Sequence, residues 1–129
     1  MTTWQQKALA LFPDLQLDIE EDGANIYTLF FELLPRCETA HVEGDIEELK
    51  KIYDFAEWCS QQEEKDLWNA AGVAFYEHLV DDPLMLEQLP FWVSDKVFEQ
   101  VSGLLEWRMG SEAFALLKTR YTNRPICSI

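Results

Sequence analysis

Apolar side chains recur every three or four residues along most of this chain, and that spacing constrains the fold more than any other feature of the sequence. It places the apolar side chains on one face of an α-helix. Residues that start or end helices, mainly Pro, Gly, Asp and Ser, separate the successive stretches. The stretches that show this spacing are 3–12, 25–42, 45–61, 65–80, 82–90, 94–110 and a last one opened by Ser111.

Residues 15–19 are the exception, because apolar and polar side chains alternate there. A single strand would have no partner, so we expect an extended segment packed against the helices. The other connections are short, which favours antiparallel packing of successive helices. We therefore predict an all-α fold: a compact single domain over residues 1–129, with six or seven helices packed as antiparallel helical hairpins and no certain strand. Residues 122–129 are expected to form a short C-terminal tail.

Particular residues predict where helices begin, bend and end. Pro35 falls inside the second helical stretch, where it must kink the helix or start a new one, because proline lacks the amide donor. Pro90 is expected to end the short helix that Asp82 begins. Asp45 followed by Glu48 is typical of a capping box at a helix N-terminus.

The composition indicates a folded and strongly acidic protein. Of 129 residues, 48% are hydrophobic and 13% aromatic, which is more apolar surface than a disordered chain carries. The formal net charge is −14, with 23 acids and 6 bases in residues 1–107 giving −17, and 1 acid and 4 bases in residues 108–129 giving +3. A negative field repels nucleic acid and anionic lipid, so we expect neither nucleic acid nor membrane as a partner. The charge fits either attraction of a basic protein partner or solubility alone.

The cysteines and the N-terminus indicate a cytoplasmic protein. Cys37, Cys59 and Cys127 are odd in number and form no C-x-x-C pair, which favours free thiols in a reducing compartment. The N-terminus has neither a basic region nor a long apolar core of the kind that signal peptides carry. The longest strongly apolar run, 26–34, is well short of the ~20 residues that span a membrane.

The best candidate metal ligands are Glu38 and His41, which share a helix face at i, i+3. Carboxylate-bridged di-metal sites need a second such pair and two further glutamates. The other histidine, His78, has Phe75 three residues before it, so the second pair is missing. His78 is either a general base or, as we favour, a hydrogen-bonded histidine beside the core. We therefore expect no metal, no cofactor and no enzymatic activity.

Acidic clusters at turns and helix starts are the candidate partner-binding residues. Carboxylates near helix N-termini are stabilised by the helix dipole, and this accounts for several of the acids between 43 and 66. Phe91 and Trp92 form either an exposed aromatic anchor or, more often for such a pair, part of the core under a loop. The residues that we predict to bind the partner are Glu20, Glu21, Asp22, Glu63 and Glu64 through charge, and Trp92 as an anchor.

Several stretches between Tyr27 and Asp82 carry a resemblance to a known family. They are Phe30-Phe31-Glu32-Leu33-Leu34-Pro35, Cys37-Glu38, Ala40-His41, 51–58 and 67–79, with a continuation at Phe91-Trp92 and Arg108-Met109-Gly110. They make the chain similar to a family of short, acidic, all-α bacterial proteins of unknown function. Small acidic helical proteins of this kind are often immunity proteins of bacterial toxin systems, so the resemblance implies an immunity-type role. It implies no catalytic residue.

These observations predict a non-enzymatic protein-binding module. Its most concrete form is an immunity-type inhibitor that neutralises a cationic bacterial toxin by occluding the active site of the toxin. One alternative is a homo-oligomeric helical scaffold, for which a homodimer is the simplest form. The other is a small metal-dependent or acid/base enzyme that uses Glu38, His41 and His78.

Overall fold

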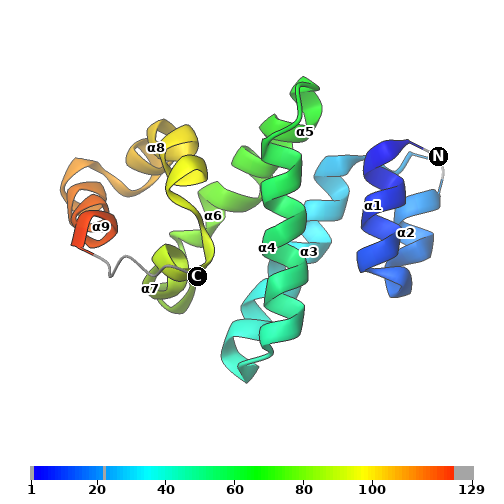
Figure 1. Cartoon of the computed structure of the whole chain (residues 1–129), viewed down its shortest axis with the longest axis horizontal. Coiled ribbons are helices and arrows are strands. Elements are labelled where there is room, and N and C mark those ends of the chain that lie inside the picture. The colour runs from blue at the N-terminus through cyan, green and yellow to red at the C-terminus, as the bar shows by residue number, and fades with distance from the viewer. Residues whose placement is uncertain (1, 22, 124–129) are drawn as a thin grey trace.

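The computed structural model describes residues 2–21 and 23–123, and all of the regular structure in these ranges is helical (Figure 1). The all-α prediction is therefore confirmed. The elements are α1 (Thr3–Leu11), the 3₁₀ turn η1 (Pro13–Leu15), α2 (Gln16–Glu20), α3 (Ile26–Glu43), α4 (Ile46–Ser60), α5 (Lys65–Ala70), the π-helical stretch η2 (Ala71–Tyr76), α6 (Glu77–Leu79), α7 (Pro83–Trp92), α8 (Asp95–Met109) and α9 (Ser111–Asn123). Because α9 runs to Asn123, the expected tail does not begin at 122, and residues 124–129 lie outside the described ranges.

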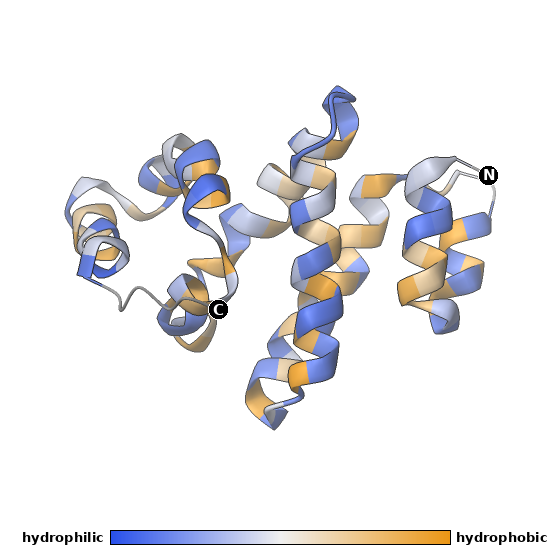
Figure 2. Ribbon diagram, viewed as in Figure 1, coloured by the Kyte–Doolittle hydropathy of each residue, from blue (hydrophilic) through white to orange (hydrophobic). Residues whose placement is uncertain are grey.

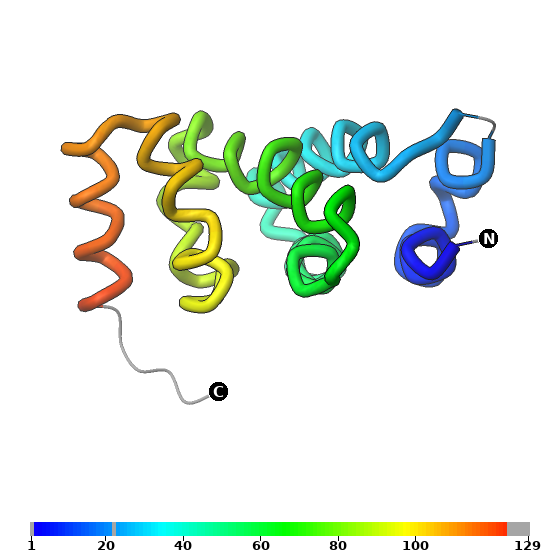
Figure 3. Tube along the Cα trace, turned by 90° about the horizontal axis from the view of Figure 1, so that it is seen from above, coloured from blue at the N-terminus to red at the C-terminus, as the bar shows by residue number. Residues whose placement is uncertain are grey.

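The elements follow one another along the long axis of the molecule. Figures 1 and 3 both show α1 and α2 at one end, the pair α3 and α4 near the middle, and α8 and α9 at the other end. Consecutive helices pack on each other, with α3 against α4 and α8 against α9. In the described residues, no helix is long and apolar enough to cross a membrane.

Side-chain caps fix most helix starts where the sequence predicts them. Asn25, Asp45, Asp82 and Ser94 each accept a hydrogen bond from the backbone N–H three residues later. Each cap satisfies one of the amide donors that the first turn of a helix leaves free. Only half of the predicted capping box at Asp45 forms, because the Glu48 carboxylate turns away and bonds to an arginine of α3 instead.

Aromatic side chains join the helices in the interior. Phe30 on α3 contacts Phe55 on α4 and Phe75 on η2, with ring centroids 5.7 and 5.6 Å apart. Phe12 adds an edge-to-face contact with Phe55, which ties α1 to the same core. Figure 2 shows hydrophobic and hydrophilic positions alternating along α4, the pattern of a helix with one buried face.

Residues 13–20 are helical, so the predicted extended segment there is wrong. Leu15 and Ile19 are four residues apart and therefore share one face of a helix, and Ile19 is fully buried on that face. Leu17 lies on the opposite face and is 81% exposed. The side-chain amide of Gln5 also donates to the Ile19 carbonyl at 2.9 Å, which ties α2 to α1. The alternation in the sequence came from this one exposed leucine.

Neither Pro35 nor Pro90 ends a helix. Pro35 lies within α3, which continues to Glu43, so Pro35 does not split it. Pro90 lies within α7, and the prediction that it ends the helix is wrong. A proline leaves the carbonyl four residues earlier without its helical donor. For Pro90 that carbonyl belongs to Leu86, and Nη1 of Arg120 on α9 donates to it at 3.2 Å.

The helix predicted at 65–80 forms as the continuous run of α5, η2 and α6. Its middle part is almost entirely buried and contacts α3, α4 and α8. At Gly72 this run lies close to a side chain of α8, because an added Cβ atom would be 3.0 Å from Cδ1 of Leu104. This run forms the centre of the domain and supports the α3–α4 pair from one side.

Candidate functional site: an acidic pocket between α3 and α4

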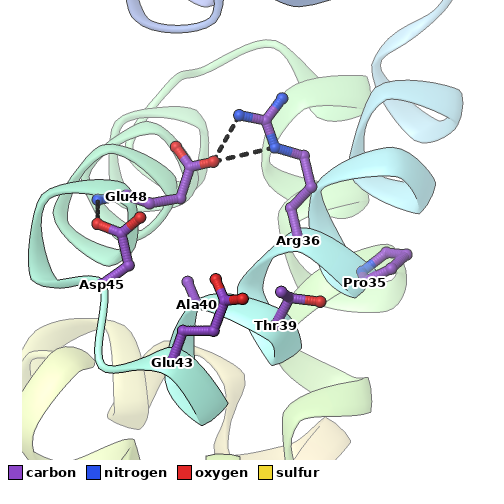
Figure 4. A pocket seen from close by; sticks show the side chains of 7 residues that line it. All are labelled: Pro35, Arg36, Thr39, Ala40, Glu43, Asp45 and Glu48. Atoms are coloured by element: carbon purple, nitrogen blue, oxygen red, sulfur yellow. Dashed lines mark hydrogen bonds and ion pairs between the residues drawn. The ribbon is translucent and has the colours of Figure 1, made fainter.

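A pocket of about 240 Å³ lies between the C-terminal half of α3 and the first turn of α4 (Figure 4). One face of α3 supplies five lining residues, and the start of α4 supplies two. The lining residues are Pro35, Arg36, Thr39, Ala40, Glu43, Asp45 and Glu48. Three of the seven are carboxylates and one is a guanidinium, so the lining carries a net negative charge.

The one base in the pocket, Arg36, is already paired. Its Nη2 lies 2.5 Å and its Nε 3.1 Å from Oε2 of Glu48, and its Nη1 lies 2.9 Å from Oδ2 of Asp14. The guanidinium also lies 5.4 Å from the ring centroid of Phe12. Asp14 and Glu48 therefore compensate the charge of Arg36. Arg36 does not compensate the negative charges of Glu43 and Asp45.

The turn between the two helices holds these acids at the pocket rim. Gly44 has φ +69, a left-handed conformation that glycine adopts without strain. The backbone N–H of Asp45 donates to the Ala40 carbonyl at 2.9 Å, which closes the turn. The Asp45 side chain accepts from the N–H of Glu48, and Glu43 is exposed at the end of α3. Both carboxylates therefore face solvent on a fixed backbone.

The structure does not bring the acids predicted from the sequence together in one place. Glu20 ends α2 and Glu21 follows it, and both are exposed. Glu63 and Glu64 are exposed between α4 and α5. Figures 1 and 3 place the end of the molecule that holds α2 apart from the start of α5. Asp22 lies outside the described residues.

Phe91 and Trp92 differ in their surroundings. Phe91 is 75% exposed, whereas Trp92 is half-buried. The Trp92 ring stacks on Tyr53 at 5.3 Å and meets the edge of His41 at 6.5 Å. Trp92 is therefore packed against its neighbours, whereas Phe91 projects into solvent.

The three residues of the enzyme alternative serve different local roles. Glu38 is exposed on α3. His41 is buried and hydrogen-bonded to Tyr53, and burial lowers its pKa. His78 lies between Asp81 and Arg108, whose guanidinium holds the pKa of the Asp81 carboxyl below its ordinary value. Among the described residues, no three His, Cys, Asp or Glu side chains are placed so that they could hold a metal ion.

The described cysteines, Cys37 and Cys59, are free, as the sequence predicts, and both are buried. Burial raises the pKa of the Cys37 thiol to about 12, so this sulfur stays protonated and unreactive near neutral pH. Burial also raises the pKa of Cys59. Cys127 lies outside the described residues.

From the sequence, the helix dipole explains only some of the pocket-lining acids. That explanation suits Asp45 and Glu48, which lie in the first turn of α4. It does not suit Glu43, which is the last residue of α3, where the helix dipole disfavours a carboxylate. The signal in the sequence was an acid on each side of Gly44, although the pairing of Arg36 could not be read from it.

Comparison with known proteins identifies a family and nothing more specific. Neither a curated protein nor a solved structure matches the chain. Residues 6–106 match a domain of unknown function, DUF7674, and this range includes every residue that lines the pocket. The chain therefore belongs to the DUF7674 family.

Proposed function

We propose that this protein is a non-enzymatic protein-binding module, and in its most concrete form an immunity-type inhibitor of a cationic bacterial toxin. The observation that carries the proposal is the α3–α4 pocket, where Glu43 and Asp45 present negative charge that Arg36 does not compensate. A basic protein would find there both charge and a concave surface.

The charge of the whole chain supports the same class of partner. At −14 overall, the protein attracts basic proteins and raises their rate of association at low salt. The exposed acids at Glu20, Glu21, Glu63 and Glu64 extend this field over other parts of the surface. Charges at such exposed positions act on encounter more than on the lifetime of a complex.

An inhibitor of this kind needs a rigid scaffold more than a reactive group. The pocket rests on α3 and α4, which pack on the buried π-helical stretch. Both histidines are engaged in internal contacts, His41 with Tyr53 and His78 with Asp81 and Arg108. These contacts favour structural roles for the residues on which the enzyme alternative depends.

The test is capture of the partner from the native host, followed by an activity assay. Tagged protein is incubated with a host extract at low salt, and the retained proteins are identified by mass spectrometry. We expect a protein of isoelectric point above about 9, whose toxic activity one molar equivalent of this protein abolishes. Retention of only acidic or neutral proteins, or a basic partner whose activity is unchanged, would refute the proposal.

Exposed aromatic side chains favour a second candidate, the homo-oligomeric scaffold. Trp107 on α8 is 76% exposed and Phe91 on α7 is 75% exposed. Large exposed apolar side chains of this type are enriched in interfaces. Sedimentation equilibrium of the wild type against Trp107→Ser tests this candidate: a dimer that the substitution dissociates supports it, and a monomeric wild type excludes it.

A further inference from the structure

We propose that the turn between α3 and α4, together with the pocket beside it, docks a basic amphipathic segment of a partner protein. A Lys or Arg side chain of the segment enters the pocket, and apolar side chains of the same segment cover the turn. This inference rests on the proposed function and names the kind of partner segment that the function requires.

The turn presents apolar and acidic side chains in direct succession. Val42 is 72% exposed and Ile46 is 60% exposed, and between them lie Glu43, Gly44 and Asp45. Single exposed apolar residues are common on protein surfaces. Here two of them flank Glu43 and Asp45 along the chain, so the turn exposes both apolar side chains and negative charge.

The pocket suits one long basic side chain. Pro35 and Ala40 supply apolar surface for a methylene stem, and Glu43 and Asp45 supply carboxylates for the charged end. Arg36 does not repel this cation strongly, because Asp14 and Glu48 compensate its charge. The sign of the rim excludes an acidic segment, a nucleic acid or an anionic lipid headgroup.

The folding of α3 alone does not explain the position of Glu43. A carboxylate in the last turn of a helix is destabilising, because the helix dipole is negative there. Glu43 has no hydrogen bond or ion pair with any residue in the described ranges that would offset this cost. A cation bound from outside would offset it, as the docked Lys or Arg side chain does.

The experiment uses two fluorescein-labelled peptides of equal length and equal charge. One is an amphipathic Lys/Leu helix and the other is a Lys/Ser peptide without an apolar face. Fluorescence anisotropy with the full chain at 0.15 M salt gives the dissociation constants. We expect the wild type to bind the Lys/Leu peptide about tenfold more tightly, which corresponds to burial of one or two apolar side chains.

Substitutions then locate the binding surface. Glu43→Lys should weaken binding of both peptides about tenfold, whereas Val42→Ser with Ile46→Ser should weaken only the Lys/Leu peptide. Glu106→Lys is the matched control, because Glu106 is exposed in the last turn of α8 and the charge change is the same. It should change binding less than twofold. Thermal melting by circular dichroism confirms folding, and Glu43→Lys should melt no lower than the wild type.

Two results would overturn the docking surface: equal affinity for the two peptides, or loss of binding with Glu106→Lys as large as with Glu43→Lys. The results that would refute the proposed function differ from those that would refute the docking surface. If a basic host partner is captured and inhibited but Glu43→Lys does not weaken its binding, the proposed docking surface is wrong and the proposed function stands. If Glu43-dependent peptide binding is found but no basic host protein is captured, the immunity role fails.

Discussion

Nε2 of His41 lies 2.7 Å from the hydroxyl oxygen of Tyr53, and this buried hydrogen bond joins the C-terminal end of α3 to α4. Trp92 packs against both rings and ties α7 to the same place. The exposed turn begins at the next residue, Val42. The bond therefore holds the backbone from which the pocket rim projects.

The first prediction concerns the pH dependence of stability. Burial lowers the pKa of His41, and the weaker effect of Asp82 only partly opposes it. The unfolded chain, with an ordinary pKa of about 6.5, therefore takes up a proton at a pH where the folded protein does not. This contribution to the free energy of unfolding is present above about pH 6.5 and is lost as the pH falls below it.

His41→Gln is the comparison that isolates this effect, because glutamine can hydrogen-bond to Tyr53 but does not titrate. Urea unfolding between pH 8 and pH 5 should show the wild type losing stability relative to His41→Gln as the pH falls. The difference between the two proteins cancels the titration of the many carboxylates. A constant difference across this range would show that His41 is not protonated more readily on unfolding.

The second prediction concerns the central helix. Ala74 is 1% exposed on the π-helical stretch, so Ala74→Arg places an unpaired charge and extra volume in the core. We expect a loss of about 3 kcal/mol, which lowers Tm by about 10 °C in a domain of this size. Ala115→Arg on the exposed surface of α9 is the control and should change stability by less than about 0.5 kcal/mol. A Tm within about 2 °C of the parent for Ala74→Arg would show that this helix is peripheral.

The third prediction is an energetic coupling between Arg120 and Pro90. Arg120 donates to the Leu86 carbonyl, the group that Pro90 leaves without a helical donor. Arg120→Ala should destabilise the wild type by about 1 kcal/mol. In a Pro90→Ala background the loss should be smaller, because the new N–H at position 90 supplies the donor. A double-mutant cycle in urea measures the coupling, and strictly additive effects would contradict it.

The fourth prediction concerns the acids singled out in the sequence. Replacing Glu20, Glu21 and Asp22 by Lys should slow association with the captured partner several-fold at low salt, because negative charges steer the encounter with a basic protein. The difference should shrink near 0.5 M salt, where screening shortens to about 4 Å. Stopped-flow binding measures both rates. Equal rates of mutant and wild type at low salt would leave these acids with solubility as their only role.

The helices could be predicted because their ends are encoded locally. The side chains at Asn25, Asp45, Asp82 and Ser94 each cap a helix within three residues of themselves. The continuation through Pro90 could not be predicted in this way. It depends on Arg120, which is thirty residues away in the sequence and supplies the missing donor from another helix.

The pocket was less predictable than the fold for the same reason. The acids on each side of Gly44 are visible in the sequence, and so is Arg36. The sequence does not show that Arg36 pairs with Asp14 and Glu48 and so leaves Glu43 and Asp45 uncompensated. These pairs depend on how α3 lies against η1 and α4. The His41–Tyr53 bond is likewise a contact between helices that no spacing within one helix indicates.

The proposed function requires that this acidic protein binds a basic partner at the pocket between α3 and α4. The most direct measurement is the affinity of the complex with the captured partner, determined by isothermal titration calorimetry between 0.05 and about 0.5 M salt for the wild type, Glu43→Lys and Glu106→Lys. We predict an affinity that falls with salt, about tenfold weaker binding by Glu43→Lys, and near-wild-type binding by Glu106→Lys. An affinity that salt does not change, and that Glu43→Lys leaves intact, would contradict binding at this pocket.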